Sequence, residues 1–77
     1  MSVFERIVEI LEKELDQKFD NVNENSTFAD LNMDSLDVVE VIMAIEDEFD
    51  IEISEGDEEN IKSLGDAAEY VENKING

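Results

Sequence analysis

Ser35 lies in the stretch Asp34-Ser35-Leu36-Asp37, and its hydroxyl is the first candidate for chemistry in this chain. A serine nucleophile needs a neighbouring base to take its proton. The 77 residues contain no His and no Cys, so the usual base is missing, and so are the usual ligands of transition metals. We therefore predict that Ser35 is an attachment point which another enzyme modifies, rather than the nucleophile of a hydrolase.

The position of Ser35 also suits a phosphate group. It falls in the first turn of a helix predicted over residues 35–49, with Asp34 as N-cap and Asp37 three residues on as its box-like partner. Free backbone N–H groups and the positive end of the helix dipole meet there. The local sequence leaves open that Ser35 is only a good first-turn residue. Four other serines also lie in predicted caps or loops: Ser2, Ser26, Ser54 and Ser63.

The same helix carries two apolar stripes, although a small soluble helix needs only one. At about 100° per residue, one stripe contains the residues expected in the core: Val38, Val41, Ile42, Ile45 and Phe49. The opposite side holds a second stripe with acidic neighbours: Leu36, Val39 and Met43, beside Asp37, Glu40 and Asp47. Apolar anchors within an acidic rim are typical of a transient docking face. The alternative is that the preceding loop covers this stripe.

Other helical patterns must position this segment. A helix over residues 3–15 begins with the capping box of Ser2 and Glu5, and a last helix over residues 64–75 begins with that of Ser63 and Asp66. The last helix is expected to bury Leu64, Ala68, Val71 and Ile75. A short helix is predicted over residues 57–61.

Residues 16–34 form a long loop between the first two helices. We expect it to be anchored on the core by Phe19, Val22, Phe28 and Leu31. The predicted fold class is therefore all-α: a small four-helix bundle of three main helices and one short third helix. We expect one domain over residues 1–77.

The charge of the chain narrows the choice of partners. Asp and Glu number 23 against 5 Lys and Arg, a formal net charge of −18, and residues 19–61 hold no basic side chain. Such a surface repels nucleic acid and anionic membranes and attracts basic protein patches. The simpler alternative is that the acid only maintains solubility. No apolar run is long enough to span a membrane and no signal-peptide pattern occurs, so we expect a cytoplasmic protein. We also expect it to be a monomer.

The segment FADLNMDSLDVVEVIMAIEDEFDIEI, residues 28–53, strongly resembles the acyl carrier proteins of fatty acid synthesis. FERIVEILEKEL and SLGDAAEYVENKI resemble the first and last helices of that family, so practically the whole chain is covered. The family's phosphopantetheine attachment motif corresponds to Asp34, Ser35 and Leu36. The resemblance implies that Ser35 carries 4′-phosphopantetheine as a phosphodiester. The thiol of that arm holds acyl groups as thioesters.

The resemblance also implies a non-catalytic carrier with two kinds of partner: a phosphopantetheinyl transferase (holo-acyl carrier protein synthase), and fatty acid synthesis enzymes with basic docking patches. The implied docking residues are Leu36, Asp37, Val39, Glu40, Met43 and Asp47. The family shelters the acyl chain between its helices, and the implied lining is Phe28, Val38, Val41, Ile42, Ile45, Ile61, Ala67 and Val71. Where the family usually has Gly-Ala before the attachment motif, this chain has Asn32-Met33. Asn tolerates the left-handed conformation such a turn needs.

Three alternatives remain open at this point. The carrier could serve a polyketide, a specialised lipid or an aminoacyl unit, because the motif does not separate these cargoes. Asp30, Asn32 and Asp34 match the first ligands of a calcium-binding loop, but Ser35 and Val41 stand where that loop needs Gly and Glu. An acidic mimic of nucleic acid would need neither the attachment motif nor a second apolar stripe.

Overall fold

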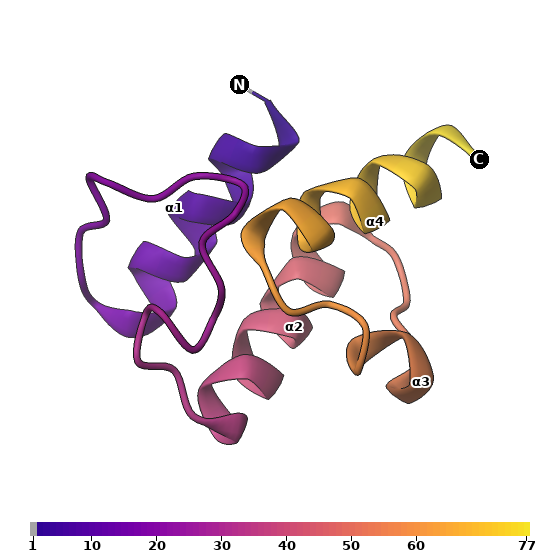
Figure 1. Cartoon of the computed structure of the whole chain (residues 1–77). Helices are drawn as coiled ribbons and strands as arrows, with labels where there is room; N and C mark the ends of the chain where they lie inside the picture. The colour runs from indigo at the N-terminus through magenta and orange to yellow at the C-terminus, as the bar shows by residue number, and fades with distance from the viewer. Residues whose placement is uncertain (1) are drawn as a thin grey trace.

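Four helices in sequence make up the structure, as predicted. The computed structural model describes residues 2–77 and contains α1 (Val3–Leu15), α2 (Ser35–Phe49), α3 (Glu55–Glu58) and α4 (Leu64–Asn76) (Figure 1). Within these residues the only β-type pairing is a single antiparallel bridge between Thr27 and Ser63. The all-α fold class is confirmed.

The three long helices begin where the local sequence predicted. The capping boxes at Ser2, Asp34 and Ser63 are all formed. In the box of α2, Asp34 Oδ1 accepts a hydrogen bond from the Asp37 N–H at 2.9 Å, and Asp37 Oδ2 accepts one from the Asp34 N–H at 3.2 Å. Each bond satisfies a backbone N–H group of the helix start. These contacts are local in sequence, which is why the pattern of residues predicted them.

The bounds predicted for the short third helix were wrong. Instead of residues 57–61, it covers Glu55–Glu58, because Ser54 is its N-cap and the Ser54 hydroxyl accepts a hydrogen bond from the Asp57 N–H at 3.2 Å. No residue of α3 is buried. An apolar periodicity anchored on Ile61 could therefore not locate it.

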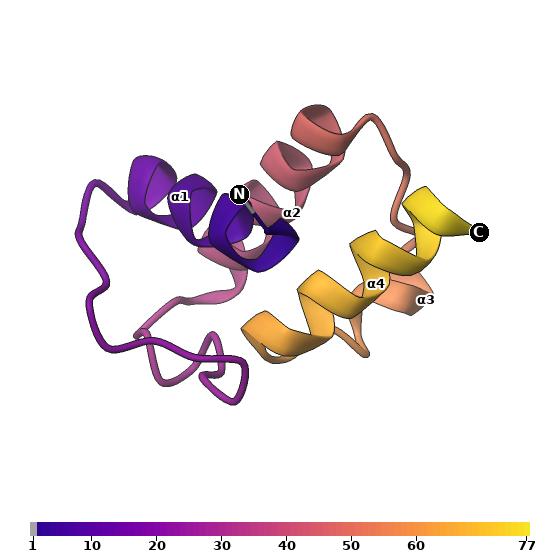
Figure 2. The same cartoon turned by 90° about the horizontal axis from the view of Figure 1, so that it is seen from above.

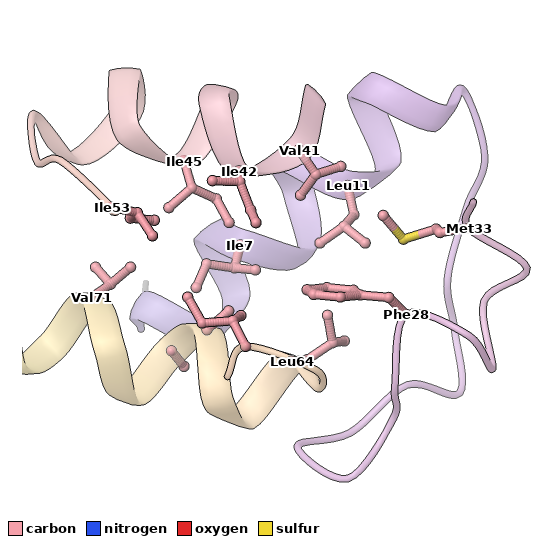
Figure 3. Packing of buried hydrophobic residues seen from close by; sticks show 13 residues of the cluster. Ile7, Leu11, Phe28, Met33, Val41, Ile42, Ile45, Ile53, Leu64 and Val71 are labelled. Carbon is pink, nitrogen blue, oxygen red and sulfur yellow. The ribbon is translucent and has the colours of Figure 1, made fainter. Parts of the chain in front are cut away.

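Helix α1 packs against both α2 and α4, so it is the common partner of the two other long helices (Figures 1 and 2). The most deeply buried side chains come from all three helices and fill the space between them (Figure 3): Ile7, Leu11, Val41, Ile42, Ile45, Leu64 and Val71. The predicted core stripe of α2 is confirmed, with Val38 and Phe49 half-buried at its margins. The predicted face of α4 was wrong at Ile75, which is 52% exposed in the last turn of that helix.

The loop over residues 16–34 is ordered by the start of α4. Its predicted anchors all pack on the core, with Phe28 buried and the other three half-buried. The Phe28 N–H donates to the Lys62 carbonyl at 3.1 Å, and the Leu64 N–H donates to the Ser26 carbonyl at 2.9 Å. Backbone pairing thus draws the loop towards α4, and it leaves the second stripe of α2 uncovered.

Gly65 lies where the loop and α4 come closest. Its N–H donates to the Glu24 carbonyl at 2.9 Å, and a Cβ atom at this position would lie 2.7 Å from that same oxygen. That is too close for two non-bonded heavy atoms, so any larger side chain must push the loop away. The absence of a side chain here is therefore a packing requirement.

We expect Gly65→Ala to lower the free energy of unfolding by about 1–3 kcal/mol, the usual cost of overpacking. Gly56→Ala is the matched control, because a Cβ atom at Gly56 meets nothing within 4 Å. In helix α3 that control should be neutral or stabilising by about 0.4–1 kcal/mol. Urea unfolding of both variants measures the difference, and equal stabilities would contradict the close contact with Glu24.

The end of α2 directs the chain into α3. Asp50 ends the helix in the left-handed conformation, with φ 54°, and the Glu46 carboxylate then accepts a hydrogen bond from the Ile53 N–H at 2.7 Å. A side chain of α2 thereby holds the segment that leads to α3. Within residues 2–77, none of the helices has the length and apolar character needed to cross a membrane.

Candidate functional site

An open groove of about 920 Å³ lies between α2, α3 and the end of the long loop. Its floor consists of buried core residues: Phe28, Met33, Ile42 and Ile61. Ser35 lies on its rim, at the start of α2, and Val38 forms part of the α2 wall. An exposed hydroxyl therefore stands beside a hollow with an apolar floor.

The hydroxyl of Ser35 differs from those of the other serines. The side chains of Ser2, Ser26, Ser54 and Ser63 each accept a hydrogen bond from a backbone N–H. No such bond involves the Ser35 hydroxyl within residues 2–77, and Ser35 is exposed. The cap of α2 is Asp34, as predicted, so the Ser35 hydroxyl is not needed to cap the helix. The Ser35 side chain makes no hydrogen bond that supports the fold.

The backbone around Ser35 suits a phosphate. The Asp34 carboxylate accepts a hydrogen bond from the Asp37 N–H, whereas the N–H groups of Ser35 and Leu36 have no acceptor among residues 2–77. These N–H groups lie in the first turn of a 15-residue helix, where no carbonyl of the same helix can accept their hydrogen bonds, and at the positive end of the helix dipole. A phosphodiester on Ser35 would find donors here, so the residues present fit the implied group.

The second apolar stripe of α2 is exposed. Leu36 is 66%, Val39 43% and Met43 58% exposed, so the alternative in which the loop covers this stripe is wrong. Glu40 and Asp47 are exposed beside it, whereas Asp37 is half-buried and engaged in the capping box. Arg6 pairs with Glu48 at 2.8 Å, and no other ion pair occurs within residues 2–77. The acidic side chains along the stripe are therefore free to meet a partner.

Half of the residues expected to line the acyl shelter border this groove: Phe28, Val38, Ile42 and Ile61. The other half are buried in the core and do not border it: Val41, Ile45, Ala67 and Val71. Helical periodicity separates buried from exposed residues, but it does not say which buried residues border a hollow.

Sequence reasoning missed the wall contributed by α3. Glu55, Glu58 and Glu59 line the groove opposite α2, and Lys62 adds a cation at its edge. Their polar character resembled an ordinary solvated turn. The only usable signal was Ser54 followed by Asp57, the spacing of a helix start.

One side-chain contact ties α3 to α4. The Tyr70 hydroxyl donates a hydrogen bond to Asp57 Oδ2 at 2.6 Å. This bond is the main reason that the pKa of Tyr70 is raised to about 12. The pKa of Asp57 is lowered, first by the bond from Tyr70 and then by a side-chain bond with Ser54. Because α3 buries no residue of its own, this contact helps to hold the α3 wall in place.

We expect Tyr70→Phe to remove a pH-dependent part of the stability. The raised pKa means that the Tyr70 bond stabilises the fold fully below about pH 10, the unfolded value, and is lost as the pH rises towards about 12. The lowered pKa of Asp57 means that the bond is also lost at strongly acidic pH. The Lys74 Nζ atom lies 5.5 Å from the centre of the Tyr70 ring.

Urea unfolding across the alkaline range, for the wild type and Tyr70→Phe, tests this expectation. The variant retains Lys74, so the difference between the two proteins isolates the hydroxyl. That difference should shrink above about pH 10. Equal stabilities of the two proteins at every pH would show that Tyr70 stabilises α3 by its ring alone, because Tyr70→Phe keeps the ring.

The acidic side chains of the alternative calcium loop take part in local hydrogen bonds. Asp30 Oδ2 accepts the Thr27 N–H at 3.1 Å, and Asp34 Oδ1 accepts the Asp37 N–H. Asn32 adopts φ 60°, the left-handed turn expected of it, rather than a ligand position. No group of three or more acidic side chains in the described part of the chain is arranged to hold a metal ion.

Known carrier proteins are similar to this chain over almost its full length. The family model described as "Phosphopantetheine attachment site" matches residues 5–71. An acyl carrier protein of Sulfurovum sp. (strain NBC37-1) is 45% identical over 74 residues, covering 95% of this chain and 99% of the relative. An acyl carrier protein of Streptococcus thermophilus (strain CNRZ 1066) is 47% identical over 74 residues, covering 96% and 97%.

A solved structure from Mycobacterium tuberculosis with the acyl carrier protein fold superimposes with a TM-score of 0.81 at 33% identity. The superposition covers 96% of this chain and 97% of the chain in that structure. These matches support an acyl carrier function in fatty acid synthesis, with 4′-phosphopantetheine as the covalent prosthetic group. With a phosphopantetheine attachment domain over residues 5–71 and two relatives at 45% and 47% identity over almost its full length, this chain belongs to the acyl carrier protein family.

Proposed function

We propose that Ser35 is the attachment residue and that the protein delivers acyl groups to the enzymes of fatty acid synthesis from this position. The observation that carries the proposal is the exposed Ser35 hydroxyl, which is unbonded within residues 2–77 and lies on the rim of the groove. When bound, the prosthetic group supplies the thiol on which acyl groups are held as thioesters. The chain itself holds the arm at Ser35, with Asp34 and Leu36 on either side.

The groove is proposed as the shelter for the acyl chain. Its floor is apolar, and burial of a methylene group is worth about 0.8 kcal/mol. The rim carries the carboxylates of α3, which make the open side of the groove polar. A chain that lies on the floor would leave only its thioester end near the rim.

The second stripe of α2 is proposed as the docking face for partner enzymes. Its apolar anchors are Leu36, Val39 and Met43, with Glu40, Asp47 and Asp37 as the acidic rim. The proposed partners are a phosphopantetheinyl transferase and fatty acid synthesis enzymes that present basic patches, because opposite charges steer encounter and fix orientation. Leu36 follows Ser35 directly, so a transferase acting on the hydroxyl would contact the same face.

The protein is proposed to act as a carrier without catalysis of its own, in the cytoplasm, as a monomer with one domain over residues 1–77. The absence of His and Cys supports the lack of catalysis, because nothing near Ser35 could serve as the usual base. The charge of −18 supports a monomer, because like charges oppose self-association.

Incubation with a phosphopantetheinyl transferase and coenzyme A tests the proposal. The intact mass should rise by one phosphopantetheine arm, and peptide mapping should place the added mass on Ser35. Mass spectrometry of the protein from its native host then names the acyl load and separates fatty acids from other cargoes. A wild-type protein that stays unmodified under these conditions would end the carrier assignment at Ser35.

A further inference from the structure

Met33 is the feature of the groove that the proposed function leaves unexplained. It precedes Ser35 by two residues, yet it is only 9% exposed and belongs to the core cluster. It also lines the groove. Met33 is therefore a core side chain that borders the hollow beside the proposed attachment residue.

The backbone holds Met33 in this inward position. Asn32 adopts φ 60°, which turns the chain, and the Met33 N–H then donates to the Phe28 carbonyl at 3.1 Å. Figure 3 shows the Met33 side chain pointing into the cluster, on the side of Phe28 and Leu11. Leu11 is 1% exposed and does not line the groove, whereas its neighbours in Figure 3, Met33 and Phe28, both do.

We infer that Met33 is a specificity-determining residue: its side chain closes the inner end of the groove and so limits the length of acyl chain that the protein can shelter. This inference rests on the proposed function, because it needs a chain attached at Ser35. It concerns the unbranched part of the cargo, which occupies space without making polar contacts.

The physical reason is close packing. Protein interiors leave few voids, so a chain can extend beyond the existing hollow only where a side chain gives way. Methionine has three rotatable bonds and packs adaptably, so it can fill the end of the groove tightly when the cargo is short. A smaller residue would leave space for more methylenes. Each additional buried methylene is expected to favour the sheltered state about fourfold.

The test uses the full-length protein, loaded by a phosphopantetheinyl transferase from saturated acyl-coenzyme A species of increasing length. For each length, urea unfolding gives the shift in midpoint between the loaded protein and the same variant carrying the arm alone. In the wild type this shift should rise with chain length and then reach a plateau. In Met33→Ala the plateau should come about two methylenes later, because the truncation removes a comparable volume.

Two control variants make the result specific. Met33→Leu conserves volume and should keep the wild-type plateau. Val71→Ala also opens a core cavity, but Val71 does not line the groove, so its plateau should not move. Each shift is referred to the same variant without cargo, so a general loss of stability cancels. Met33→Val replaces Met33→Ala if the latter does not fold.

The outcomes separate the inference from the proposed function. Absence of a mass gain in the wild type would overturn attachment itself. Loading without any midpoint shift would overturn the sheltering of the chain in the groove, and with it the role of Met33, but not attachment at Ser35. The same plateau in wild type and the smaller Met33 variant would overturn only the role of Met33. A plateau that moves equally in Val71→Ala would assign the effect to core softness and also overturn that role.

Discussion

Ser35→Ala is expected to abolish attachment of the arm while leaving the fold as stable as the wild type. The hydroxyl forms no hydrogen bond with the rest of residues 2–77, and the cap of α2 is Asp34, so the truncation removes no structural contact. Alanine is a good residue in the first turn of a helix. After treatment with a phosphopantetheinyl transferase and coenzyme A, the intact mass should remain that of the unmodified chain. Urea unfolding should give the wild-type midpoint.

Ser2→Ala is the matched control, because Ser2 is also an exposed serine at a helix start but has the opposite role. Its hydroxyl accepts the Glu5 N–H at 3.1 Å as the N-cap of α1. We expect this variant to be fully modified and to lose about 1 kcal/mol of stability, the usual value of an N-cap. Persistent labelling of Ser35→Ala would move the attachment site to another hydroxyl and contradict the proposed role of Ser35.

Glu40→Lys is expected to give the second largest effect, on the rate of encounter with partner enzymes. Glu40 is exposed beside the apolar stripe of α2, and no basic side chain of residues 2–77 pairs with it. Reversal of its charge places a cation where a basic patch must approach. We expect the transferase to modify the variant about threefold to tenfold more slowly at low ionic strength. The deficit should narrow as salt is added, because the Debye length falls to about 8 Å at physiological ionic strength.

Glu72→Lys provides the control for net charge. Glu72 is exposed on α4, and the substitution changes the total charge by the same amount as Glu40→Lys. If the general field of the protein governs association, both variants should slow equally. If the stripe of α2 is the docking face, Glu40→Lys should be much the slower. Asp37 is unsuitable for this comparison, because its carboxylate also completes the cap of α2.

The start of each long helix could be predicted because its determinants are local. A cap requires two side chains three residues apart, and Ser2 with Glu5, or Asp34 with Asp37, satisfy that geometry in any context that permits a helix. The two stripes of α2 were predictable for the same reason, since periodicity alone places Ile45 and Met43 on different faces. The resemblance to carrier proteins then added the chemical role of Ser35.

Contacts between distant segments could not be predicted in this way. The loop is held by the Glu24 and Ser26 carbonyls, which pair with the start of α4, and no local pattern announces that pairing. Tyr70 bonds to Asp57 across 13 positions. The groove depends on both sets of contacts. The pairing of the loop with α4 keeps the loop away from the second stripe of α2, and the bond between Tyr70 and Asp57 holds the α3 wall of the groove.

The sequence by itself determined the three long helices, their caps and the separation of the two apolar stripes of α2, because each depends on residues within about two helical turns of one another. Only the tertiary structure decided that the stripe is open, that α3 lines the groove, that Ile75 is exposed and that the buried Met33 borders the groove. These features arise where separate segments meet. The free energy of such a meeting depends on the shapes of all the surfaces involved, and periodicity along one segment carries no information about the others.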